Sequence, residues 1–127
     1  VYADRPRHEQ NRLIASVIST AQERRAVARA IVRKLAAAQG KVKVIVPREG
    51  IQEWDREGQP LHEPEAHRAF VDEFVGGLRT PIEVLELDGH INDASFTDAV
   101  LATFDDWVKA GIIPPGTPAA LPASPSV

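Results

Sequence analysis

Residues 82–93, Ile-Glu-Val-Leu-Glu-Leu-Asp-Gly-His-Ile-Asn-Asp, begin as an apolar β-rich run and end in a polar turn around one glycine. The first six residues predict a strand, and the asparagine or the final aspartate is suited to cap a helix that follows. In an open α/β sheet, ligands usually bind at the carboxyl ends of the strands. This stretch therefore predicts a site formed by Asp88, Gly89, His90, Asn92 and Asp93.

The remainder of the chain alternates strand and helix patterns. β-Favouring runs at 12–18 and 41–46 predict two more strands, and residues 48–62 between periodic segments predict a long loop. Helices are predicted from 21 to 38, from 63 to 78 and from 93 to 110. The order β-α-β-loop-α-β-α predicts a three-layer α/β/α Rossmann-like domain with parallel strands and right-handed crossovers.

Several local signals refine these elements. Thr20 and Glu23 have the spacing of a capping box, and Gly40 is placed to close the first helix in a left-handed conformation. Trp107 and the apolar residues around it predict a buried face on the third helix. His62 and His67 are expected at the surface. The full predicted inward face of the third helix is Phe96, Ala99, Val100, Thr103, Phe104, Trp107 and Val108.

Composition restricts the class of protein. The chain of 127 residues is 43% apolar and 26% charged, which is typical of one globular domain. A net charge of −3 disfavours general nucleic-acid binding, and the absence of cysteine excludes disulfides and thiolate chemistry. No apolar run reaches the roughly 20 residues needed to cross a bilayer. We therefore expect a cytoplasmic protein with no nucleic-acid or membrane partner.

The sequence also suggests a domain organisation. Residues 1–11 are predicted to be an irregular lead-in, residues 12–112 an α/β domain, and residues 113–127 a disordered Pro-rich tail. The chain has no methionine and opens on Val1, so we expect it to be part of a longer protein. Three strands are few for a sheet covered on both faces, which agrees with that expectation.

Since parallel strands point the same way, the loops after the second and third strands should face each other across a cleft. Arg48, Gly50 and the backbone amides near Gly89 could then hold an anion at the start of the third helix. An Asp88–His90 acid–base pair is the enzymatic alternative, and simple hydrogen bonding of the turn is the structural one. Asp88, His90 and Asp93 could also bind a divalent metal, although their spacing matches no ligand motif.

Three segments carry a family resemblance: residues 46–50, Val-Pro-Arg-Glu-Gly; residues 58–66, Gly-Gln-Pro-Leu-His-Glu-Pro-Glu-Ala; and residues 86–93. They resemble the carboxyl-terminal domain of the Tm-one-like ATP-binding family, which includes the plant tobamovirus-resistance protein. The family pattern has a serine where this chain has Gln52. The resemblance covers about residues 1–110 and implies a two-domain protein whose amino-terminal α/β domain lies outside this chain.

The resemblance implies nucleotide binding and self-association, with Gly50, Asp88, His90, Asn92 and Asp93 as site residues. Three functional hypotheses follow. The domain could form one wall of an inter-domain cleft for ATP, another nucleotide or another small anion, with Arg48, Gly50, Gly89, Asn92 and Asp93 in contact with the ligand. It could instead be a hydrolase or lyase that uses His90 and Asp88 as an acid–base pair, although the sequence lacks the G-x-S-x-G motif that carries the nucleophilic serine of α/β-hydrolases. It could also act mainly in homo-oligomerisation.

Overall fold

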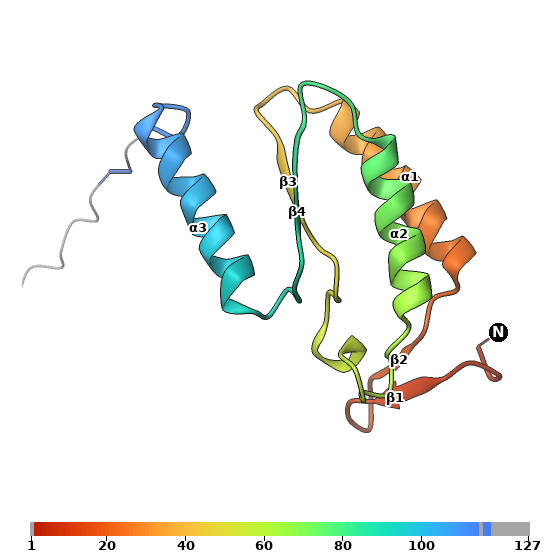
Figure 1. Cartoon of the computed structure of the whole chain (residues 1–127). Helices are drawn as coiled ribbons and strands as arrows, with labels where there is room; N and C mark the ends of the chain where they lie inside the picture. Colours follow the sequence, from red (N-terminus) through yellow and green to blue (C-terminus); the bar gives the residue numbers. More distant parts are fainter. Residues whose placement is uncertain (1, 115, 118–127) are drawn as a thin grey trace, which may run out of the picture.

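The computed structural model describes residues 2–114, 116 and 117. Its elements are β1 (Arg7–Glu9), β2 (Ala15–Val17), α1 (Ala21–Ala36), β3 (Lys43–Pro47), the short 3₁₀ turn η1 (Glu53–Asp55), α2 (Pro64–Gly77), β4 (Glu83–Leu87) and α3 (Ala94–Lys109). In Figure 1 the pair β3–β4 stands between α1 and α2 on one side and α3 on the other. The predicted α/β class is confirmed.

The central sheet consists of β3 and β4, which run parallel with Lys43 opposite Glu83 and Pro47 opposite Leu87. Both strands fall where the apolar runs predict them. Their shared direction brings the loops that follow them to the same edge of the sheet, and this edge carries the candidate site.

The expected third parallel strand at 12–18 is wrong. Residues Ala15–Val17 form β2, which pairs antiparallel with β1 in a separate two-stranded sheet, so the predicted irregular lead-in is also wrong at Arg7–Glu9. The cause is local turn chemistry: the Asn11 side-chain oxygen accepts hydrogen bonds from the amides of Leu13, at 2.8 Å, and Ile14, at 3.0 Å. This side-chain turn reverses the chain before a longer strand can form.

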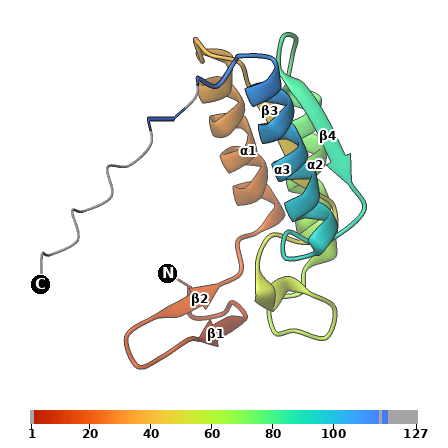
Figure 2. The ribbon, with the colours of Figure 1, turned by 90° about the vertical axis from the view of Figure 1, so that its left-hand side faces the viewer.

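The hairpin formed by β1 and β2 is attached to the domain at two points. Arg5, just before β1, makes a bidentate ion pair with Glu23 of α1, with N–O distances of 2.7 and 3.0 Å. The ring of His8 packs against Trp54 in the loop after β3, with centroids 5.0 Å apart. Figure 2 shows the hairpin beyond the ends of α1 and α2, beside this loop. Trp54 therefore contacts the hairpin.

Helix α1 begins as predicted. The Thr20 hydroxyl accepts from the Glu23 amide at 3.2 Å, and the Glu23 carboxylate accepts from the Thr20 amide at 2.9 Å, which completes the capping box. The predicted role of Gly40 is wrong, because Ala37 is the C-cap and Gly40 has no positive φ. Ala37 and Ala38 instead close the last turn with hydrogen bonds to Lys34 and Leu35 carbonyls.

The core lies between α1, α2 and the sheet. Its buried members are Ala28, Val46, Val71, Phe74 and Leu78. Gly77 allows the two helices to approach closely, because a Cβ at that position would lie 3.0 Å from a methyl carbon of Val32. Gly77 is a poor helix former at the end of α2, but its lack of a side chain permits α2 to pack on α1.

Helix α3 does not bury the face that its periodicity predicts. None of its residues is buried, and Leu101 and Phe104 are 55% and 52% exposed. Trp107 is half-buried, with the Lys41 ammonium 5.7 Å from its ring centroid. The physical reason is the narrow sheet, since two strands give a helix little surface to cover. The prediction of a fully buried apolar face is therefore wrong for the described residues.

Two further expectations concern the chain ends and membranes. The predicted disordered tail, 113–127, falls largely outside the described residues, and the domain span 12–112 stays a prediction. Across the part of the chain that is described, helices are too short or too polar to cross a bilayer.

Replacing Thr20 with alanine should lower the free energy of unfolding by about 1 kcal/mol, the usual contribution of an N-cap hydroxyl. Urea denaturation of the full-length protein measures this change. Ser19→Ala, which keeps Thr20 and Glu23, is the matched control. Equal losses in the two variants would contradict the assigned cap.

Acid should weaken the contacts that Glu23 makes with Arg5 and Thr20. The hydrogen bond from Arg5, together with the Thr20 amide, lowers the pKa of Glu23 from 4.5 to about 2. Because the folded pKa is depressed, the stabilising contribution is complete above about pH 4.5 and is lost as the pH falls toward 2. A Glu23→Gln variant should therefore show a smaller stability difference from wild type at pH 3 than at pH 7. An unchanged difference would refute the assignment.

Candidate functional site

The loops after β3 and β4 are hydrogen-bonded to each other. The Glu49 amide donates to the Gly89 carbonyl at 3.0 Å, and the Ile91 amide donates to the Gly50 carbonyl at 3.1 Å. A parallel bridge between Gly50 and His90 extends the ladder beyond the strands. The sequence correctly predicts that these loops meet, but the expected cleft between them is wrong, because backbone pairing closes it.

His90 is the centre of this closed junction. Its side chain is 1% exposed, and Nε2 lies 2.9 Å from Asp55 Oδ1 and 3.0 Å from the Gln52 carbonyl oxygen. The Asn92 amide donates to Nδ1 at 3.1 Å. Since a carbonyl can only accept and an amide N–H can only donate, the ring is neutral with its proton on Nε2. Both ring nitrogens are thus occupied.

The predicted Asp88–His90 pair is therefore wrong, because a different carboxylate is the partner of His90. Asp55, which is buried, holds His90, whereas Asp88 is exposed. The other Asp55 oxygen accepts from the Ile51 amide at 2.9 Å. Asp55 belongs to η1, 35 positions before His90, so no local spacing in the sequence signals the pair. The arrangement fixes the loops and leaves the imidazole no free nitrogen for proton transfer.

Gly50 is required where the two side chains meet. Its φ is 143°, and a Cβ built there would lie 2.2 Å from Asp55 Oδ1 and 2.6 Å from His90 Cδ2. Any side chain would therefore displace the pair and strain the backbone. Gly50 is among the site residues that the Tm-one-like resemblance implies, and its geometry here gives it a structural reason.

His67, on α2, is a second buried histidine. It is 5% exposed, and Nε2 lies 3.0 Å from the Pro47 carbonyl oxygen, so Nε2 carries the proton. Among the described residues, Nδ1 has no hydrogen-bond partner. An unsatisfied buried acceptor costs free energy and needs an explanation, such as a bound group. The predicted surface position of His67 is wrong.

A signal for its burial exists in the sequence. His67, Val71, Phe74 and Leu78 recur at intervals of four, three and four, and all four are buried. This is the spacing of one helix face. The four-residue repeat of Ala66, Phe70, Phe74 and Leu78 predicts an apolar stripe that shares Phe74 and Leu78 with this face, and the histidine is missed because it is polar.

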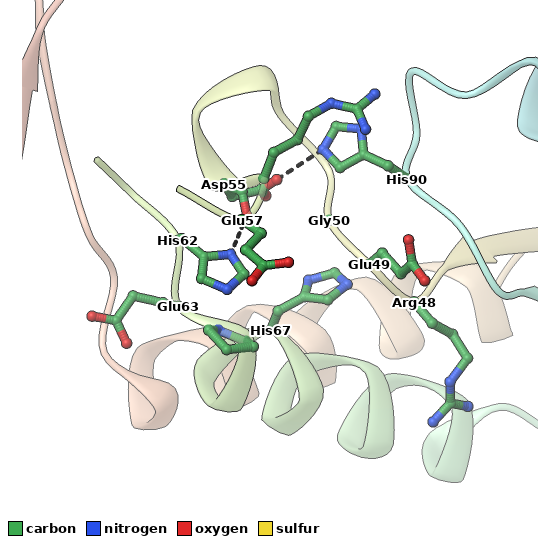
Figure 3. Close-up of a pocket in the computed structure, with 11 residues that line it drawn as sticks. Arg48, Glu49, Gly50, Asp55, Glu57, His62, Glu63, His67 and His90 are labelled. Carbon is green, nitrogen blue, oxygen red and sulfur yellow. Dashed lines mark hydrogen bonds and ion pairs between the residues drawn. The ribbon is translucent and has the colours of Figure 1, made fainter. Parts of the chain in front are cut away.

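The candidate site is a cavity of about 500 Å³ between the β3 end and the start of α2. Its size falls within the range of about 300–1,000 Å³ typical of small-molecule sites. Figure 3 shows the Glu57 carboxylate and the rings of His62 and His67 below the Asp55–His90 hydrogen bond. The lining residues are Arg48, Glu49, Gly50, Asp55, Arg56, Glu57, His62, Glu63, Pro64, His67 and His90.

Three predicted site residues, Arg48, Gly50 and His90, line this cavity. Asp88 is exposed and does not line it, and Asn92 and Asp93 belong to the junction beside it. Asn92 donates to Glu53 at 3.0 Å, and Asp93 accepts from the His90 amide at 2.8 Å and from Arg56 at 3.0 Å. The His90 amide and then Arg56 lower the pKa of Asp93. Gly89 is buried near Asp93 and does not reach the cavity.

His62 and Arg48 have partners at the cavity rim. His62 Nδ1 lies 2.8 Å from the Asp55 carbonyl oxygen, so this nitrogen donates, and Arg48 forms an ion pair with Glu86. Within the described residues no group of three or more metal-ligating side chains is assembled. The metal alternative at Asp88, His90 and Asp93 thus gains no geometric support.

The fold and the cavity define an α/β domain with a polar pocket at the carboxyl edge of a parallel sheet. A profile described as the uncharacterised protein family UPF0261, C-terminal domain, matches residues 1–108. The chain belongs to the UPF0261 family and corresponds to its C-terminal domain.

Similar proteins agree with this assignment. The UPF0261 protein BMEII0128 of Brucella melitensis biotype 1 is 50% identical over 115 residues, which is 91% of this chain and 28% of that protein. A UPF0261 protein of Brucella suis biovar 1 is 49% identical over the same shares. The ToMV resistance protein Tm-1(GCR237) of Solanum lycopersicum is 30% identical over 81% of this chain and 14% of its own length. The Tm-one-like resemblance is confirmed, and the chain spans just over a quarter of the Brucella relatives.

Removing the Asp55 side chain should destabilise the fold strongly. Asp55→Ala leaves the Ile51 amide without its acceptor and deprives the His90 Nε2–H of one of its two acceptors, which should cost about 1–3 kcal/mol. Asp88→Ala, at an exposed position, should stay within about 0.5 kcal/mol of wild type. Denaturant unfolding of the full-length protein provides both values. Similar losses in the two variants would argue against the junction.

Proposed function

We propose that this domain binds a polar small molecule, a nucleotide or another anionic compound, in the cavity between the β3 end and the α2 start. The domain would form one wall of a cleft that other parts of the protein complete. The observation that carries the proposal is His67, whose Nδ1 is a buried acceptor without a partner among the described residues, on a ring that lines the cavity. A ligand hydroxyl or amine would satisfy it.

The surroundings favour a ligand over an ordinary crevice. One wall of the cavity is formed by Gly50, Asp55 and His90. It is rigid, because all three residues are buried and the side chains of Asp55 and His90 are hydrogen-bonded to each other. Rigid support positions a ligand at little entropic cost. The opposite wall is the amino end of α2, where the Glu63 side chain makes no cap hydrogen bond and Pro64 occupies the first turn. Such an end favours a negatively charged ligand group.

The same geometry disfavours the enzymatic alternative. A general base needs a free nitrogen within hydrogen-bond reach of substrate, and both nitrogens of His90 are engaged within the protein. Asp88, the proposed orienting carboxylate, contributes nothing to the cavity lining. Binding is therefore the function that the arrangement supports best.

A thermal-shift screen of the full-length protein against nucleotides and phosphorylated metabolites tests the proposal. A ligand at 100 times its Kd should stabilise the fold by about 2.7 kcal/mol. Glu57→Gln should weaken that ligand about 10-fold or more, since hydrogen bonds to charged groups contribute about 1.5–3 kcal/mol. Glu65→Gln, at an exposed α2 position outside the cavity, is the matched control. Stabilisation that both variants retain equally, or no stabilisation by any compound, would overturn the proposal.

Self-association is a second candidate, favoured by the exposed apolar residues of α3. Leu101 and Phe104 are 55% and 52% exposed, and Val108 is 43% exposed. Apolar side chains grouped on one helix mark contact surfaces more often than isolated ones do. Light scattering of the full-length protein should show a mass that falls when Leu101 and Phe104 are both changed to lysine. A monomeric wild type would exclude this role.

A further inference from the structure

A second, smaller recess adjoins the cavity. It encloses about 170 Å³ and is lined by Arg48, Pro64, Arg68 and Val71. Arg48 and Pro64 also line the main cavity, so the two spaces share a rim. In Figure 3 the Arg48 side chain points away from Glu57 and His62 and toward α2. A ligand larger than the main cavity could therefore extend into the recess beside this arginine.

The main cavity offers hydrogen-bond acceptors. Three glutamates, Glu49, Glu57 and Glu63, line it together with the His67 ring and its unpartnered Nδ1, and in Figure 3 the Glu57 carboxylate is the one that lies beside the rings of His62 and His67. The two arginines that also line it are already paired, Arg48 with Glu86 and Arg56 with Asp93. Ionised carboxylates accept hydrogen bonds and repel anions. The part of a ligand that occupies this space should therefore carry donors, of which hydroxyl groups are the simplest, and should lack negative charge.

The recess offers the opposite chemistry. Two of its four lining residues are arginines, Arg48 and Arg68, and guanidinium binds phosphate through paired N–H donors. Arg48 is already paired with Glu86, whereas no carboxylate in the described part of the chain forms an ion pair with Arg68. The recess also lies at the first turn of α2, since Pro64 belongs to both. The positive end of the helix dipole adds to the arginine charges there.

We propose that the site takes a phosphorylated polyhydroxy compound, with its hydroxyl groups on the Glu57 carboxylate and His67 of the cavity and its phosphate between Arg48 and Arg68. This rests on the proposed binding function and assigns the ligand class and its orientation. A nucleoside monophosphate or a sugar phosphate has both parts. Inorganic phosphate lacks the donors for the cavity, and an unphosphorylated sugar or nucleoside lacks the group for the recess.

Titration calorimetry of the full-length protein with matched pairs tests this orientation. The pairs are ribose 5-phosphate with ribose, glucose 6-phosphate with glucose, and AMP with adenosine. At least one phosphorylated member should bind 10-fold or more tightly than its partner. Arg68→Gln should reduce that ratio at least threefold, whereas Glu57→Gln should weaken both members of the pair alike. Arg25→Gln, an exposed arginine on α1, is the charge-matched control.

The possible failures are distinct. Equal binding of the two members of each pair, or a ratio that Arg68→Gln leaves unchanged, would overturn the ligand class while Glu57-dependent binding still supported the cavity. Binding of no pair member would also overturn the ligand class. Binding that is insensitive to Glu57→Gln as well would overturn both the orientation and the proposed function.

Discussion

The hydrogen bond between Asp55 and His90 is the constraint on which the site depends. It joins the loop after β3 to the loop after β4 across Gly50, where no side chain fits. The 1% exposed imidazole and the 5% exposed carboxylate satisfy each other and three backbone groups. Buried polar groups that are fully paired rigidify their surroundings. The cavity wall that contains His90 is thus held in place by a neutral histidine whose two ring nitrogens are both engaged in hydrogen bonds.

The sheet edge that carries the candidate site could be predicted from the sequence, and the hydrogen bonds between its residues could not. The strand end at Leu87 and the following Gly-His pair indicate the correct sheet edge. The partner of His90 is 35 positions away in an irregular loop, where no periodicity applies. Similarly, the capping box at Thr20 is a local signal and is confirmed. Asn11 shows the converse, because its side-chain turn converts a β-favouring run into an antiparallel hairpin.

The fold and the proposed ligand fit together through the start of α2. Pro64 fixes where the helix begins, His67 packs inward one turn later, and Arg68 lines the recess. The start of α2 thereby supplies the His67 acceptor to the cavity and the Arg68 cation to the recess, and the positive end of the helix dipole lies beside both. Helix α3, which carries the exposed Leu101 and Phe104, lies on the other side of the sheet from α1 and α2 in Figure 1, so a protein surface that contacts it would approach from the side away from α2.

The protonation of the His90 ring tests this account most directly. Long-range proton–nitrogen NMR of the full-length protein at pH 7 distinguishes the two ring nitrogens. The structure predicts a neutral ring with the proton on Nε2 and an unprotonated Nδ1, because Nε2 faces two oxygens and Nδ1 faces an amide donor. A proton on Nδ1 would contradict the junction, and with it the assignment of His90 as a structural residue of the site.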